Sequence, residues 1–251
     1  VVNNAAAIMY ASERLHSDQV LLRRAIQHLQ YIDIESVEFS HFLKFIEKVV
    51  RLDGTLLQYV PKRIQENPSF WGVVYAALLG NNPTNRTDAD RLERTDAIIP
   101  DVSQELHRDY SFINGLMQRD GLMLKYQMME QFDAKEYYNI ALSAVKQNGM
   151  AFADVKTDAS CISTLMYAAV QQNGMALQFI HPKPREISKQ ISSSYLYWIV
   201  IEAVKENGMA LQFIVESNGS GLDFISAITE LNLNDDDLYN IIEEALRKNG
   251  M

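Results

Sequence analysis

Apolar residues recur in the second half of the chain with the period of an amphipathic helix. The phrase Asn-Gly-Met occurs at four places, and a helix-capping residue type stands 15 positions before each of its asparagines. Apolar side chains fall 4, 7, 8, 11 and 12 positions after each cap, as in a helix with one buried face. The asparagines are Asn148, Asn173, Asn207 and Asn249, and the caps are Asp133, Asp158, Ser192 and Asn234. The predicted helices span 134–148, 159–173, 193–207 and 235–249.

A methionine follows the glycine of each phrase, so that every predicted helix ends in an Asn-Gly-Met corner. Glycine after a helix end is typical of a Schellman turn, which needs a left-handed residue. We therefore expect positive φ at Gly149, Gly174 and Gly208, with the following methionine packed on the preceding turn. An alanine occupies position 11 of all four helices, which indicates the close approach of a neighbouring helix there. These alanines are Ala144, Ala169, Ala203 and Ala245.

Weaker copies of the pattern occur upstream, with corners at Asp53-Gly54, Asn81-Asn82 and Asp120-Gly121. The corners at Gly149 and Gly174 lie 25 residues apart, and we take this spacing as the bare unit. The upstream helices are expected near 15–30, 37–53, 67–81 and 104–120. The sequence thus predicts an all-α fold, a solenoid-like array of about eight degenerate helical hairpins.

Three insertions interrupt the predicted array, which divides into degenerate repeats at 1–132 and regular repeats at 133–251. The first insertion, 83–102, is polar and charged, and is expected to form a surface loop with a short helix. The other two, 181–191 and 215–233, lie in the regular part. Because the last helix keeps a full apolar stripe, we expect the array to continue beyond Met251. We also expect it to begin before Val1, as part of a longer protein.

Composition narrows the class of protein. Of the 251 residues, 47% are hydrophobic and 22% are charged, as in ordinary globular proteins. The net charge of −9 disfavours nucleic acid and anionic membrane surfaces as partners, and no apolar run reaches the ~20 residues that span a bilayer. The single cysteine, Cys161, excludes an internal disulfide and favours a cytoplasmic location.

Two features suggest catalysis, but neither is accompanied by the residues that the chemistry needs. His107, Asp109 and Asn114 fit the H-R-D-x-x-x-x-N loop of protein kinases, without a glycine-rich loop, strand lysine or D-F-G. Cys161 lies near a predicted helix start, where a thiol can be activated, without a recognisable partner histidine. The histidines are scattered, and the acidic run 234–237 suits a helix start better than a calcium loop. We therefore predict no catalytic, cofactor-binding or metal-binding residues.

Three stretches share one phrase: SERLHSDQVLLRRAI (12–26), YNIALSAVKQNGMAF (138–152) and WIVIEAVKENGMALQFI (198–214). They resemble a repeat family of unassigned function, whose units read roughly acidic-x-x-x-V-L-x-A-V-x-x-N-G-x-A-L-x-Y. Such units occur in arrays in large proteins of protists and intracellular bacteria, some of them candidate secreted effectors. The resemblance implies a helical-repeat fold and, for an effector, delivery to the host cytosol. It implies no catalytic residue.

Two functions of different classes fit these observations. The first is a non-catalytic protein-interaction scaffold or substrate-recruiting domain, because helical arrays leave extended surfaces open to partners. The second is an enzyme whose active site is built from the insertions between repeats. The lack of a catalytic signature favours the scaffold, so we predict a protein partner and no cofactor.

Overall fold

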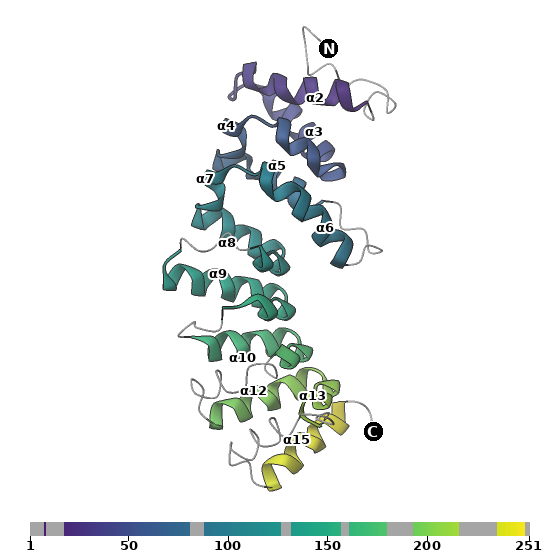
Figure 1. Cartoon of the computed structure of the whole chain (residues 1–251), viewed down its shortest axis with the longest axis vertical. Helices are drawn as coiled ribbons and strands as arrows, with labels where there is room; N and C mark the ends of the chain where they lie inside the picture. The colour runs from purple at the N-terminus through teal and green to yellow at the C-terminus, as the bar shows by residue number, and fades with distance from the viewer. Residues whose placement is uncertain are drawn as a thin grey trace. The chain divides into compact units, whose positions relative to one another are not determined.

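The computed structural model describes residues 8, 18–80, 88–126, 132–156, 161–179, 193–215 and 235–248. The regular elements in these ranges are helices (Figure 1). None of these residues forms a strand, which confirms the all-α prediction. The chain divides into two compact units, Val1–Phe112 and Ile113–Met251.

The first unit alternates α-helices with short 3-10 helices. Its elements are α2 (Gln19–Gln27), η2 (His28–Tyr31), α3 (Val37–Leu52), η3 (Gly54–Tyr59), α4 (Lys62–Gln65), η4 (Pro68–Phe70), α5 (Trp71–Leu79), α6 (Asp88–Ile98), η5 (Ile99–Asp101), α7 (Gln104–His107) and the start of α8 (Tyr110–Arg119). α3 packs against α5. Phe42, Ile46 and Val74 are completely buried, so these two helices supply much of the core of this unit.

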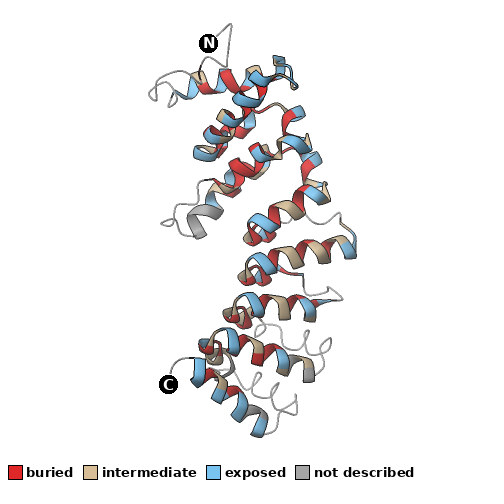
Figure 2. Ribbon diagram, turned by 180° about the vertical axis from the view of Figure 1, so that it is seen from behind, coloured by how far each residue is buried: buried red, intermediate tan, exposed pale blue. Residues whose placement is uncertain are grey.

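The second unit repeats one arrangement, in which a long helix is followed by a short 3-10 helix. After α8 come η6 (Gly121–Lys125), α9 (Ala134–Gln147), η7 (Gly149–Asp154), α10 (Ile162–Gln172), η8 (Gly174–Phe179), α12 (Ser193–Glu206), η9 (Gly208–Leu211), α13 (Gln212–Val215) and α15 (Asp235–Lys248). α9 packs against η6 and α10, α10 against η7 and α12, and α12 against η8 and α15. Buried residues run along these helices (Figure 2). In α9 and α10 they include every position of the predicted stripe: Tyr137, Ile140, Ala141, Ala144 and Val145, then Ile162, Leu165, Met166, Ala169 and Val170.

Four helices have the predicted ends to within one residue. α3, α9, α12 and α15 each begin at the predicted residue and end one residue before the predicted end. Asp133 and Glu136 form a capping box, each side chain accepting the backbone N–H of the other. α10 begins at Ile162 rather than at residue 159. The other predicted caps, at residues 158, 192 and 234, lie outside the described residues.

A single helix over 104–120 is a wrong prediction. α7 ends at His107 and α8 begins at Tyr110. The side chain of Asp109 accepts a hydrogen bond from the Phe112 N–H at 2.9 Å, as a helix cap does. This carboxylate starts a new helix in the middle of the predicted one.

The corners are not Schellman turns, and the prediction of left-handed glycines at 149, 174 and 208 is wrong. Among the described glycines, positive φ occurs at Gly80 alone, with a value of 62°. Gly80 ends α5, two residues before the corner predicted at Asn82. The three predicted glycines instead begin 3-10 helices.

An Asx turn builds each corner. Asn148 is extended, with φ −148° and ψ 110°, and its side-chain oxygen accepts the N–H of Met150 at 3.0 Å. The residue that ends one helix therefore caps the next, as aspartate and asparagine do in turns. The same bond, at 3.0–3.1 Å, is made by Asp53, Asp120, Asn173 and Asn207.

Close packing accounts for glycine at these corners. A Cβ on Gly149 would lie 2.3 Å from the carbonyl oxygen of Ala169. The equivalent distance is 2.2 Å from Gly174 to Ala203, and also from Gly121 to Ala144. The carbonyl always belongs to the alanine at position 11 of the next helix, so the close approach predicted from these alanines is confirmed.

The corner glycines also donate their amides to the next helix. The N–H groups of Gly121, Gly149 and Gly174 donate to the side chains of Gln147, Gln172 and Glu206, respectively. All three acceptors stand immediately before the next corner asparagine. In α15 this position holds Lys248, whose ammonium group cannot accept a hydrogen bond.

The expected insertion at 83–102 is an integral part of the first unit over its described residues, 88–102. The Arg94 guanidinium of α6 donates to the carbonyl oxygens of residues 50–52 at 2.9–3.1 Å and to that of Ala77 at 3.3 Å. Ile98 is completely buried. The predicted short helix is present as α6, and it is longer than expected. Residues 88–102 are not a loop on the surface, because the Arg94 side chain of α6 caps the carbonyl end of α3.

Candidate protein-interaction surface

The kinase-like motif serves the fold. The Asp109 carboxylate caps α8, and Phe112 between Asp109 and Asn114 is completely buried. His107 is half-buried in α7; burial lowers the pKa of its imidazole, and the charge of Lys62 lowers it further. Asn114 is a half-buried residue of α8.

Cys161 is an exposed cysteine at the cap position of α10, where its side chain makes no capping hydrogen bond. No group of three or more His, Cys, Asp or Glu side chains that could hold a metal ion occurs in the described part of the chain. The second and third predicted insertions lie outside the described residues, apart from Val215.

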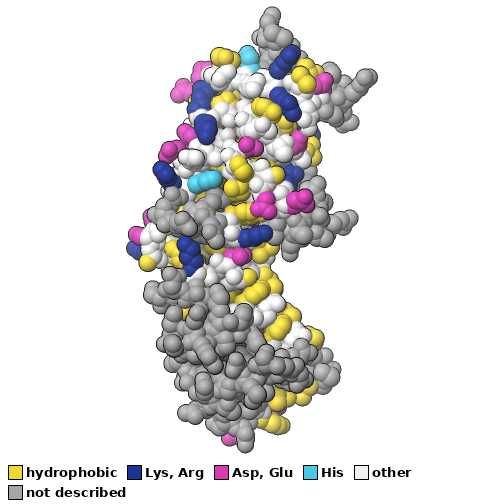
Figure 3. Space-filling view, in the orientation of Figure 1, with side chains coloured by type: hydrophobic (Ala, Val, Ile, Leu, Met, Phe, Trp, Pro, Cys, Tyr) yellow, Lys and Arg dark blue, Asp and Glu magenta, His cyan; other side chains and the backbone are white. Residues whose placement is uncertain are grey.

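A methionine edge, formed by Met150, Met175 and Met209, runs along the corners of the second unit. Figure 3 shows hydrophobic side chains gathered on the margin where these 3-10 helices lie. Met150 and Met175 are half-buried. Their sulfur atoms lie 3.9 Å from the side-chain amide nitrogens of Gln178 and Gln212, respectively, in the next repeat. Met150 and Met175 therefore serve packing between successive repeats of the second unit, whereas Met209 is exposed.

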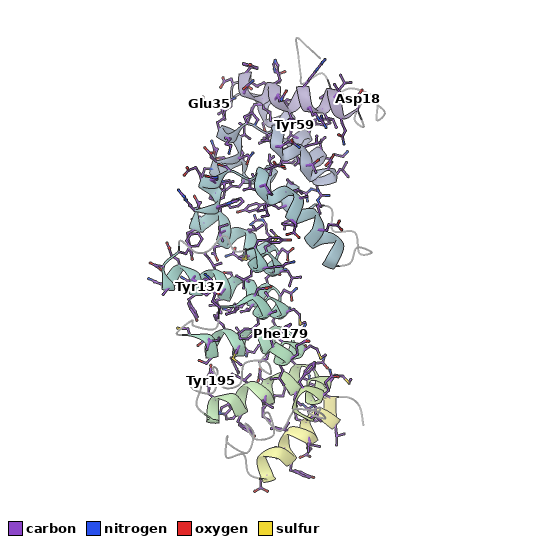
Figure 4. All side chains as sticks on the ribbon, viewed as in Figure 1. Asp18, Glu35, Tyr59, Tyr137, Phe179 and Tyr195 are labelled. Carbon is purple, nitrogen blue, oxygen red and sulfur yellow. The ribbon has the colours of Figure 1, made fainter. Side chains whose placement is uncertain are left out.

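An aromatic cluster lies on the outer side of α10 and α12. Its members are Tyr167, Tyr195, Tyr197 and Trp198. The Tyr167 and Tyr195 rings lie 6.2 Å apart across the two helices, and the Tyr197 and Trp198 rings lie 5.6 Å apart. Trp198 is three residues after Tyr195, which makes the two side chains neighbours on the helix. Figure 4 labels Tyr195 on α12 and Phe179 at the end of η8, the 3-10 helix that follows α10.

Trp198 makes this cluster a candidate for binding. Its side chain is 56% exposed, although burying an indole ring releases more free energy than burying most other side chains. The three tyrosines are half-buried, and the ring of Tyr197 pairs with that of Trp198. The cluster is therefore an aromatic platform in which one ring is largely exposed.

Polar groups border the platform on one side. Gln171 of α10 donates to Glu202 of α12 at 3.2 Å, which ties the two helices together. Burial raises the pKa of the Tyr167 phenol, and the neighbouring Glu202 and Tyr195 raise it further. Tyr167 therefore stays neutral at physiological pH and presents a hydroxyl group beside the Glu202 carboxylate.

The sequence carries one signal for this cluster that the repeat pattern does not explain. The run Tyr195-Leu196-Tyr197-Trp198 places aromatic residues at positions 3, 5 and 6 after the predicted cap, outside the apolar stripe. Large apolar residues that gather in one patch outside a buried stripe mark a candidate interaction site.

Comparison with protein-family models, with curated proteins and with solved structures gives no match. None of the described helices is long and apolar enough to cross a membrane.

Proposed function

We propose that this chain is a non-catalytic protein-interaction module that binds its partner on the aromatic cluster of α10 and α12. The observation that supports this proposal is the exposed ring of Trp198, which pairs with Tyr197 on the helix that also carries the Tyr195 ring paired with Tyr167. Tryptophan and tyrosine dominate the residues whose truncation weakens protein interfaces most. A rigid aromatic platform also loses little conformational entropy when it binds.

The platform fits a protein segment that carries arginine or lysine together with aliphatic side chains. A guanidinium or ammonium group stacks favourably on the Trp198 ring, and Glu202 provides a carboxylate beside it. The net charge of −9 favours the approach of a basic segment over long distances. Aliphatic side chains would cover the exposed parts of the tyrosine rings.

The test uses a displayed library of random 16-residue peptides selected on the whole chain. We expect the selected peptides to be enriched in arginine, lysine and aliphatic residues. We expect Trp198→Ala to weaken their binding at least about tenfold, as loss of a central interface residue does. Tyr31→Ala is the matched control, because Tyr31 is an exposed aromatic residue of the first unit; it should leave binding unchanged.

Peptides that bind wild type and Trp198→Ala equally would contradict the proposed site, and so would a selection without enrichment. Circular dichroism should show that the variant keeps its helices, since Trp198 is exposed.

The proposal includes the solenoid-like array as the framework of this module. The repeated Asx corners and the successive packing of α9, α10, α12 and α15 support it. A role as an effector and a cytoplasmic location rest on the family resemblance and on cysteine usage, and both stay predictions.

A further inference from the structure

A carboxylate stands one helical turn after the exposed tryptophan of the aromatic cluster. Tyr195, Trp198 and Glu202 follow the i, i+3, i+7 spacing of α12, so their side chains are successive neighbours on one face of this helix. Helical side chains lean toward the helix N-terminus, and this lean directs the Glu202 carboxylate toward the Trp198 ring. An exposed indole and a negative charge therefore lie side by side.

The neighbouring helix restrains that carboxylate. The side-chain amide of Gln171 in α10 donates to Glu202 Oε1 at 3.2 Å, and Glu202 is half-buried. Among the described residues, Gln171 is the donor to this carboxylate, so Oε2 remains as an acceptor for a partner. The Glu202 side chain is thus oriented before a partner binds.

We propose, building on the proposed function, that Trp198 and Glu202 together select arginine over lysine in the bound segment, with Gln171 as a positioning residue. The guanidinium plane of the partner's arginine would stack on the Trp198 indole. Its edge would donate hydrogen bonds to the Glu202 carboxylate.

The chemistry of the two basic side chains separates them at such a site. A guanidinium group is flat and weakly hydrated, so it can stack on an aromatic ring while its edge donates two hydrogen bonds to a carboxylate. An ammonium group is compact and strongly hydrated, and it has no flat face to lay on the ring. Lysine therefore makes this pair of contacts less completely than arginine.

Competition between two displayed peptide libraries, selected on the whole chain, tests the proposal. Both libraries contain random 16-residue peptides, but the basic residue is arginine in one and lysine in the other. We expect arginine peptides to be recovered at least about tenfold more often from the wild-type chain. The best arginine peptide, resynthesised with lysine at the same position, should bind about tenfold more weakly.

Two variants assign this preference to the named side chains. Glu202→Gln keeps the size of the side chain and removes its charge, so the arginine preference should fall from about tenfold to less than about threefold. Gln171→Ala should lower the preference in part, while thermal stability and the affinity for lysine peptides stay nearly unchanged. A purely structural role for Gln171 would not give that result.

Glu243→Gln is the matched control. Glu243 is an exposed carboxylate of α15, and its replacement changes the net charge by the same amount as Glu202→Gln. This variant should keep the full arginine preference, because Glu243 lies on another helix.

Equal recovery of the two libraries from wild type would overturn the selection of arginine, and so would a preference that persists in Glu202→Gln. In both cases the proposed function would still stand, provided that Trp198→Ala weakens binding. Recovery of no specific peptide, or of peptides that bind Trp198→Ala and wild type equally, would contradict the proposed function itself and the selection of arginine with it.

Discussion

The corners at Gly54 and Gly149 share one backbone geometry but differ in what fills the space beside them. At both, an extended Asp or Asn accepts the N–H two residues later, and the glycine lies against a carbonyl oxygen of the next long helix. A Cβ on Gly54 would lie 2.7 Å from the Ala77 oxygen and 2.1 Å from Cδ1 of Ile98. At Gly149 the three atoms nearest to this Cβ all belong to residues 169–173, whereas at Gly54 α6 adds Arg94 and Ile98.

This difference separates two ways of holding successive helices together. At Gly149, the next helix supplies both the close carbonyl and the Gln172 side chain that accepts the glycine amide. In the first unit, the Arg94 guanidinium donates hydrogen bonds to the carbonyl oxygens of residues 50–52 and of Ala77. In the second unit, contacts between adjacent repeats thus hold the helices at each corner. In the first unit, the Arg94 guanidinium, which comes from a later segment of the chain, links the helices at the Gly54 corner.

The largest expected effect comes from removing that cation. Arg94→Ala would leave several carbonyl oxygens without their donor, and we expect it to destabilise the first unit by about 3 kcal/mol. Arg94→Lys should recover part of this loss, since one ammonium group cannot reach all four carbonyls. Hydrogen exchange during urea titration would measure the loss separately in each unit.

The exposed Arg108→Ala variant serves as the control for charge and should have little effect. Equal loss of protection in α10 and α12 would show that the two units do not differ in the way described.

The next largest effect is expected at the regular corners. Gly174→Ala would force a Cβ to 2.2 Å from the Ala203 oxygen, and we expect it to destabilise the protein by about 2 kcal/mol in chemical denaturation. Gly174→Asn should cost at least as much, although asparagine tolerates left-handed backbone well. Gly72→Ala is the control, because its Cβ would meet only the flexible carboxylate end of Glu47.

A mild Gly174→Asn variant beside a costly Gly174→Ala would point back to a left-handed corner. That result would contradict the close-packing explanation.

A smaller effect is expected from the side chains that accept the glycine amides. Gln172→Ala would leave the Gly149 N–H without this acceptor, at a cost of about 1 kcal/mol. Glu206→Gln keeps an acceptor and should stay within about 0.5 kcal/mol of wild type, whereas Glu206→Lys removes it. Thermal melts of the three variants, with the exposed Lys205→Ala as control, would rank them; equal stabilities for Glu206→Gln and Glu206→Lys would contradict the role of the acceptor.

The sequence predicted features that depend on a single helix. The stripes of α9 and α10 follow from the period of 3.6 residues, and the cap at Asp133 follows from its own side chain and that of Glu136. The prediction of positive φ at the corner glycines is wrong because Asn-Gly suits a left-handed helix end as well as an Asx turn. The deciding contact, with the Ala169 carbonyl, belongs to another helix.

The role of α6 and the aromatic cluster escaped prediction for related reasons. Arg94 lies in a charged segment that resembles a surface loop, and three of its four acceptors are more than 40 residues earlier in the chain. Trp198 stands outside the apolar stripe, but only the packing of α12 shows that its ring is left exposed. Tertiary neighbours decide both cases.

The smallest expected effect is a pH dependence confined to the first unit. Burial, followed by the charge of Lys62, lowers the pKa of His107 below its ordinary value of 6.5. The unfolded chain therefore binds this proton more readily than the folded one, so stability is complete above about pH 6.5 and falls as the pH drops through that value. Between pH 7.5 and 5.5, hydrogen exchange should become faster around α7, and His107→Gln should remove most of this change. Lys62→Gln should reduce it in part, because one of the two causes is lost. An unchanged pH response in both variants would assign the effect to other groups.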